Sequence, residues 1–103
     1  MLKRVKRRYL ALRLDGDCVL PEREFLDFVW RSVTQVYGEY GASFAGLALI
    51  HYDADSKTAV LRVSLESLVS VRAALALITH VGGHEVAVHV AGVSGTLKGL
   101  RGQ

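Results

Sequence analysis

Apolar and polar residues alternate in several short segments of the chain, and a period of two residues predicts β-strands. In residues 8–14 three leucines share one face, while Tyr9 and Arg13 share the other. A strand with one apolar face packs that face against a core. Similar patterns predict three further strands, at residues 44–52, 58–64 and 85–93.

Two longer segments carry apolar residues at helical spacing. The first begins at Pro21, which suits the first turn of a helix, and acidic residues follow it near the positive end of the helix dipole. We expect this helix to end at Gly38 or Gly41. The second helix is expected over residues 65–80, before a Gly-Gly pair, and a short helical turn over residues 96–100.

The predicted order is strand, helix, strand, strand, helix, strand. This order is typical of an α+β, ferredoxin-like (RNA-recognition-like) βαββαβ sandwich, in which two helices cover one face of an antiparallel sheet. We expect one such domain over residues 9–103, with a short C-terminal helical turn, after a basic arm at residues 1–8. The first and third strands are central in this fold, so Tyr9, Arg13 and Arg62 are expected on the uncovered face.

The second predicted helix is apolar around most of its circumference. Its only charged residues are Glu66 and Arg72. A helix of this kind is buried on more than one side, and in a chain of 103 residues we expect another subunit to cover it. A well-packed, alanine-rich core helix is the alternative. The candidate interface residues are Leu68, Val71, Arg72, Leu75 and Ile78.

The net charge of +3 is distributed unevenly along the chain. Residues 1–8 carry five basic side chains and no acidic one. The remaining 95 residues carry eight basic and ten acidic side chains, a balance of −2. A short basic arm usually contacts phosphates or an acidic partner. A tail that only increases solubility is the alternative.

Several classes of protein and site are disfavoured. The single cysteine, Cys18, excludes an internal disulfide framework, and no apolar run approaches the roughly 20 residues that span a bilayer. We therefore expect a soluble cytoplasmic protein. The four histidines lack the spacing of a zinc site, and the aspartate pairs at 15–17 and 53–55 fall in expected turns. No serine has the context of a nucleophile, so we expect neither catalytic residues nor a metal site.

Residues 92–99 are rich in glycine and connect the last strand to the helical turn. Exposed amides at such a point, with Ser94, Thr96 and Lys98 close by, suit a phosphate group. The segment lacks the spacing of a nucleotide-binding P-loop, and a glycine-rich strand end without a ligand is an equal alternative. The third strand has no aromatic residue, so if the protein binds RNA, it does so through phosphates and shape rather than base stacking.

Four segments occur together and in order along nearly the whole chain. They are residues 6–10 (KRRYL), 37–41 (YGEYG), 71–78 (VRAALALI) and 92–98 (GVSGTLK). With them the sequence resembles the archaeal and eukaryal ribonuclease P protein subunits of the Pop-five/Rpp-fourteen family. The resemblance implies a ferredoxin-like fold and a non-catalytic subunit. Such a subunit supports the catalytic RNA, which uses Mg²⁺, when ribonuclease P cleaves precursor tRNA to mature its 5′ end.

The resemblance also implies partners and contact residues. The partners are ribonuclease P RNA, precursor tRNA and a larger TIM-barrel-like protein subunit, with self-association into a heterotetramer and no membrane contact. The second helix is then a candidate protein interface. The residues expected to contact RNA are Lys3, Arg4, Lys6, Arg7, Arg8, Tyr9, Arg13, Arg62, His89, Ser94, Thr96, Lys98 and Arg101.

Two other classes of function share the predicted fold. An acylphosphatase-like hydrolase uses an asparagine together with an arginine, and this sequence contains no asparagine. A ligand-binding or dimerisation module would explain the apolar second helix, but it leaves the basic arm without a role.

Overall fold

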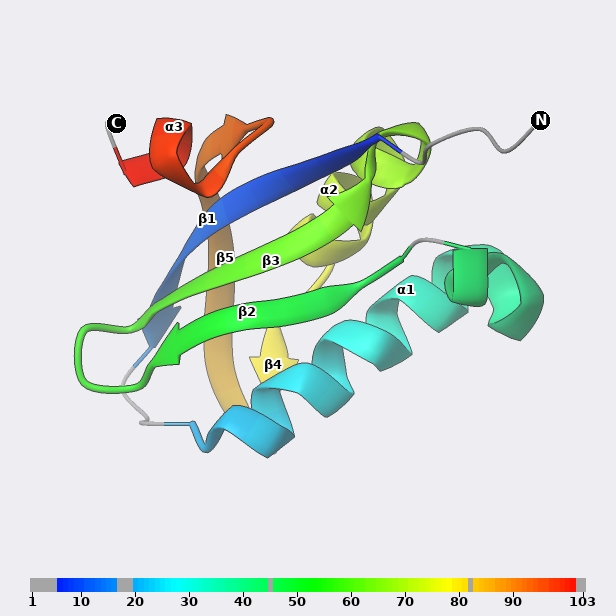
Figure 1. The fold of residues 1–103 in the computed structure, drawn as a ribbon. Coiled ribbons are helices and arrows are strands. Elements are labelled where there is room, and N and C mark those ends of the chain that lie inside the picture. Colours follow the sequence, from blue (N-terminus) through cyan, green and yellow to red (C-terminus); the bar gives the residue numbers. More distant parts are fainter. Residues whose placement is uncertain (1–5, 17–19, 45, 82, 102–103) are drawn as a thin grey trace, which may run out of the picture.

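The computed structural model describes residues 6–16, 20–44, 46–81 and 83–101 (Figure 1). Three helices and five strands follow one another along these residues, with a single 3-10 turn before the second helix. In chain order they are β1 (Arg7–Gly16), α1 (Glu22–Phe44), β2 (Ala48–Asp53), β3 (Thr58–Ser64), the 3-10 turn Leu65–Ser67, α2 (Leu68–Ala76), β4 (His80–Val81), β5 (His84–Ser94) and α3 (Leu97–Arg101).

The strands form one antiparallel sheet in the order β2-β3-β1-β5-β4. Strands β1 and β3 are therefore inside the sheet, as the ferredoxin-like prediction requires. Strand β1 begins at Arg7, so the last two residues of the predicted arm belong to the sheet. No helix within the described ranges is long and apolar enough to cross a membrane.

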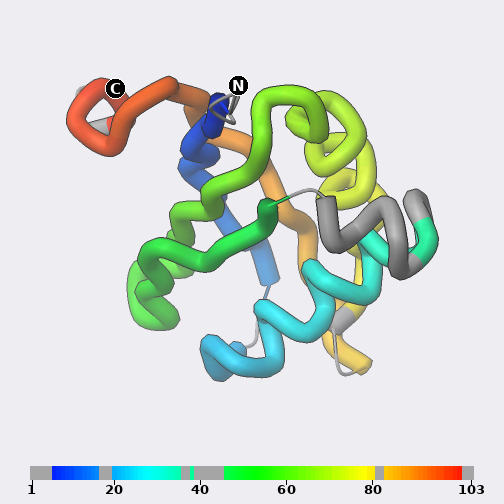
Figure 2. The backbone as a smooth tube through the Cα atoms, turned by 45° about the vertical axis from the view of Figure 1, so that its right-hand side comes forward, coloured from blue at the N-terminus to red at the C-terminus, as the bar shows by residue number. Residues whose placement is uncertain are grey.

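Helices α1 and α2 cover the same face of the sheet (Figure 2). The alternation of β1 turns its three leucines toward them. Burying an aliphatic or aromatic side chain of this size stabilises the fold by about 1.5–3 kcal/mol. The largest fully buried side chains come from the sheet and from both helices: Phe25, Leu10, Leu12, Leu61, Leu75, Val29, Val33, Val63 and Val71.

Helix α1 begins as predicted, just after Pro21, whose carbonyl accepts the first helical hydrogen bond from the Phe25 N–H at 3.1 Å. The Phe25 ring stacks on Tyr52 of β2 at a centroid distance of 5.3 Å. The regular helix is interrupted at Gly38, where φ is +76°. One further segment of helix continues to Phe44, so β2 begins four residues later than the strand predicted at 44–52.

Strand β4 was not predicted, and the second helix is shorter than expected. Helix α2 ends at Ala76, because Ile78 turns into the core, where it is 6% exposed. The Thr79 carbonyl then accepts a hydrogen bond from the Val86 N–H at 2.9 Å. The chain after α2 therefore runs alongside β5 and forms the two-residue strand β4 at the sheet edge.

Helix α3 lies on the opposite side of the sheet from α1 and α2 (Figure 2). The Thr96 hydroxyl caps it by accepting a hydrogen bond from the Gly99 N–H at 3.0 Å. Leu100 is 7% exposed, and α3 packs against β1 and β5. The face that we expected to be uncovered is thus covered in part by α3. We call the rest of it the open face.

Candidate nucleic-acid interface

The register of the sheet brings three predicted RNA-binding residues into one row across the open face. Tyr9 on β1 lies opposite Arg62 on β3 and opposite Ser94 on β5. Tyr9 and Arg62 are both partly buried. The Nε atom of Arg62 is buried and has no hydrogen-bond partner among the described residues. This row places a cationic group and two hydroxyl groups side by side.

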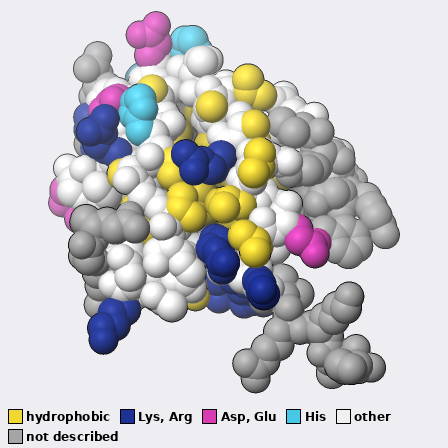
Figure 3. Space-filling model, turned by 90° about the horizontal axis from the view of Figure 1, so that it is seen from above, with side chains coloured by type: hydrophobic (Ala, Val, Ile, Leu, Met, Phe, Trp, Pro, Cys, Tyr) yellow, Lys and Arg dark blue, Asp and Glu magenta, His cyan; other side chains and the backbone are white. Residues whose placement is uncertain are grey.

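Further cations surround this row at the start of β1. The side chains of Lys6 and Arg7 are exposed, and the guanidinium of Arg8 donates a hydrogen bond to the Arg7 carbonyl at 2.9 Å. Arg8 also reaches Gly95, where an added Cβ would lie 3.4 Å from its Nη1. Figure 3 shows Lys and Arg side chains gathered beside a hydrophobic patch. We call Lys6, Arg7, Arg8, Arg62 and the exposed Lys98 the basic end.

The glycine-rich segment after β5 differs in one respect from the predicted phosphate site. The Thr96 N–H donates to the Ser94 hydroxyl at 3.2 Å, and the Gly99 N–H donates to the Thr96 hydroxyl. A Cβ at Gly99 would overlap the Ser94 hydroxyl oxygen, so a larger residue there would displace that hydroxyl from its hydrogen bond with Thr96. Two backbone amides are therefore occupied by the chain's own hydroxyls, and Lys98 is the group that can reach a phosphate.

The other end of β1 has a different character. Arg13 lies opposite His89 of β5, and both side chains approach Asp15. The His89 Nε2 atom is 2.8 Å from Asp15 Oδ2, and the Arg13 Nη2 atom is 3.9 Å from the same oxygen. We call these three residues the carboxylate end. The row of Tyr9 and Arg62 and the carboxylate end are thus about 13 Å apart, measured along β1 from Tyr9 to Arg13.

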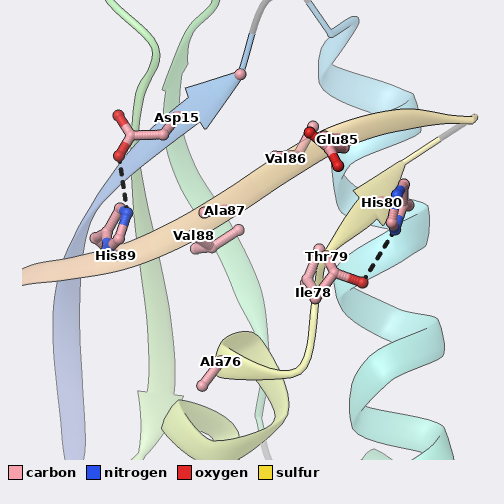
Figure 4. Close-up of a pocket in the computed structure, with 11 residues that line it drawn as sticks. Asp15, Ala76, Ile78, Thr79, His80, Glu85, Val86, Ala87, Val88 and His89 are labelled. Atoms are coloured by element: carbon pink, nitrogen blue, oxygen red, sulfur yellow. Dashed lines mark hydrogen bonds and ion pairs between the residues drawn. The ribbon is translucent and has the colours of Figure 1, made fainter.

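An open cavity of about 660 Å³ borders the carboxylate end. Figure 4 shows it between β1, β5 and the connection from α2 to β4, with Glu85 and His80 on its other side. The Thr79 hydroxyl lies 3.1 Å from His80 Nδ1. Within the described ranges, no three His, Cys, Asp or Glu side chains are arranged to hold a metal ion. The carboxylates of Asp15 and Glu85, which line this cavity, repel a phosphate. The basic end is therefore the better candidate for binding RNA.

The comparison with known proteins decides the family. The model of the Rpp14/Pop5 family matches residues 8–103. This chain belongs to the Rpp14/Pop5 family. The resemblance seen in the sequence is therefore confirmed, and so is the fold that it implied.

Curated proteins match most of the chain in sequence, and a solved structure matches it in fold. A ribonuclease P protein component 2 of Pyrococcus horikoshii is 33% identical over 98 residues, which cover 95% of this chain and 82% of that protein. The protein of the same name from Archaeoglobus fulgidus is 35% identical over 95 residues, which cover 92% of this chain and 84% of that protein. A chain in the cryo-EM structure of yeast ribonuclease MRP has a TM-score of 0.74 at 13% identity, covering 94% of this chain and 79% of that one.

The structure corrects the residues chosen on the second helix. Val71, Leu75 and Ile78 are 0%, 1% and 6% exposed and pack in this chain's own core, so they offer no surface to a partner. Instead, the large exposed apolar side chains on and beside α2 are Val69 at 79% and Leu77 at 69%. Sequence reasoning missed both, because a helix that is apolar on all sides gives no contrast between its faces.

Among the other candidates, Arg72 is exposed and Leu68 is half-buried, so both remain candidates for a partner contact in this Rpp14/Pop5 chain. Lys3 and Arg4 lie outside the described residues, as does the side chain of Arg101.

Proposed function

We propose that this chain is a protein subunit of ribonuclease P. It supports the catalytic RNA during the cleavage that matures the 5′ end of precursor tRNA. Family membership and the charge distribution support this proposal. Within the described residues, both ion pairs lie at the carboxylate end, and none involves the cations of the basic end. No carboxylate of the described residues therefore competes with an external anion for these cations.

The contribution of the chain is electrostatic and positional. Folded RNA brings phosphate backbones together against their repulsion, and Lys and Arg side chains offset that repulsion while fixing the register of the backbone. Mg²⁺ would be held by the RNA, where it would supply activation of the attacking water and stabilisation of the leaving oxygen. No side chain of this protein takes part in the chemical step.

The exposed apolar residues of α2 suit a protein partner. Val69 and Leu77 are large and exposed, and the exposed Arg72 lies one helical turn after Val69, a composition typical of protein interfaces. We assign this surface to the larger TIM-barrel-like subunit of ribonuclease P, with self-association completing a heterotetramer in the cytoplasm. A ligand-binding dimer without RNA would use the same surface but would leave the basic end without a role.

The test is cleavage of precursor tRNA by the reconstituted particle over a series of Mg²⁺ concentrations. In the main variant, Lys3, Arg4, Lys6, Arg7 and Arg8 are replaced by alanine. We expect the Mg²⁺ concentration at half-maximal rate to rise at least about twofold, because metal ions must replace the lost cations. The matched control is Arg23→Ala with Arg31→Ala on α1, which should behave as wild type. An unchanged rate and Mg²⁺ requirement in the main variant would contradict the proposal.

A further inference from the structure

A groove crosses the open face between α3 and the strands β2 and β3. Its volume is about 360 Å³. Two of its apolar walls are unusually accessible, since Ile50 is 38% and Leu97 is 37% exposed. The lining residues are Ile50, His51, Val60, Leu97 and Leu100.

Two separate features of the fold build this groove. The pairing of β2 with β3 shifts between Leu49, opposite Leu61, and His51, opposite Val60, so Ile50 is the extra residue of a bulge. On the other side, the Thr96 cap and the buried Leu100 fix α3 against the sheet. The groove is thus held open by a strand irregularity and a capped helix, not by a chance gap between loops.

The groove combines apolar walls with neighbouring cations. Arg62 is two residues from Val60 and therefore on the same face of β3. Arg62 is partly buried, and among the described residues it makes no ion pair with a carboxylate. Lys98 directly follows Leu97 and is exposed. A purely apolar occupant would make no use of these two cations, whereas a base with its anionic phosphate offers a flat surface to the apolar walls and a negative charge to the cations.

We infer that this groove binds one unpaired nucleobase of the RNA partner, with the adjoining phosphate at Arg62 and Lys98. This inference rests on the proposed function, because it places the groove within the RNA-binding surface. Sequence-specific RNA recognition generally uses bases that are splayed out of the helix. The sequence offered no aromatic residue on β3 for that purpose. Here the aliphatic walls and the His51 ring take the place of an aromatic stacking surface.

Three RNA hairpins test the inference with the full chain. The first carries a single unpaired adenine as a bulge, the second carries an abasic nucleotide at that position, and the third is fully paired. Fluorescence anisotropy at a fixed salt concentration measures the three affinities. We expect the adenine bulge to bind about tenfold more tightly than either other hairpin, which corresponds to about 1.4 kcal/mol. On wild-type protein, the Ile50 and Leu97 methyl resonances should shift with the adenine bulge and not with the abasic one.

Substitutions locate the preference in the groove. Ile50→Ser and Leu97→Ser should reduce the preference for the bulge to within twofold while leaving the affinity for the paired hairpin unchanged. Val69→Ser on α2 is the matched control, because it also removes an exposed apolar side chain, and it should retain the tenfold preference. Equal affinities for the three hairpins, without methyl shifts, would overturn the inference and leave the proposed function standing. Absence of binding to all three would overturn both.

Discussion

Both ends of the open face contain arginine, but the neighbours of that arginine differ between them. At the basic end, Arg7 and Arg62 have no ion-pair partner among the described residues. At the carboxylate end, Arg13 and His89 both approach the Asp15 carboxylate. An arginine beside a carboxylate gives up part of its attraction for an external phosphate. Residue type alone therefore does not identify an RNA-binding side chain, and its neighbours across the sheet matter equally.

The largest effect that this comparison predicts follows from removing the basic end. Lys6→Ala, Arg7→Ala and Arg8→Ala combined should weaken binding to ribonuclease P RNA at least about tenfold. The slope of log K against log salt concentration should fall by about 2–3, because up to three phosphate contacts are lost. Filter binding over a salt series measures both quantities. The double variant Arg13→Ala, His89→Ala is the control. An equal loss of affinity in that variant would contradict the proposed difference in RNA binding between the two ends.

Single arginines on neighbouring strands should give a smaller difference. Arg62→Ala should weaken RNA binding about threefold to fivefold, since its guanidinium lies in the row with Tyr9 and Ser94. Arg13→Ala should change affinity less than twofold, because its partner carboxylate already neutralises it in part. Isothermal titration with the same RNA compares the two proteins. Indistinguishable affinities would show that the open face contacts RNA uniformly.

The smallest effect concerns the acidic residue itself. Asp15→Asn removes the negative charge beside Arg13 and His89, and affinity for the RNA should rise less than twofold, because Asp15 lies about 20 Å along β1 from the row of Tyr9 and Arg62. The control is Asp55→Asn in the turn after β2, which also removes one carboxylate and should leave the affinity unchanged. An increase of tenfold for Asp15→Asn alone would mean that the RNA extends over the carboxylate end.

Local patterns predicted most of the fold. Strand β3 spans the predicted residues 58–64, and β1 and β5 differ from prediction by a residue or two. In these strands the alternation is regular and one face is buried, so local pattern and tertiary packing agree. The turn after β2 was also predicted correctly. There the Asp53 carboxylate accepts the Ser56 and Asp55 N–H groups at 3.3 and 3.0 Å, and the Ser56 hydrogen bond lowers the pKa of Asp53 below its usual value.

The sequence-based predictions failed where tertiary contacts determine the structure. Helix α2 stops at Ala76 because Ile78 is needed in the core and Thr79 pairs with Val86, and neither contact is local in the sequence. The candidate site shows the same limit. Asp15 was expected in a turn, but β1 continues to Gly16 and so places Asp15 on the same face as Arg13. The approach of His89 depends on the register between β1 and β5. That register shifts between Ala11 and Leu12, which no local pattern indicates.

Site-specific photo-cross-linking in the reconstituted particle tests the central claim, that RNA lies at the basic end, most directly. A photoreactive phenylalanine analogue replaces Arg7 in one protein and Arg13 in another. Both positions are exposed and lie on β1 with the same strand parity. We predict that the cross-linked yield to ribonuclease P RNA is at least about fivefold higher from position 7. An equal or higher yield from position 13 would contradict the account.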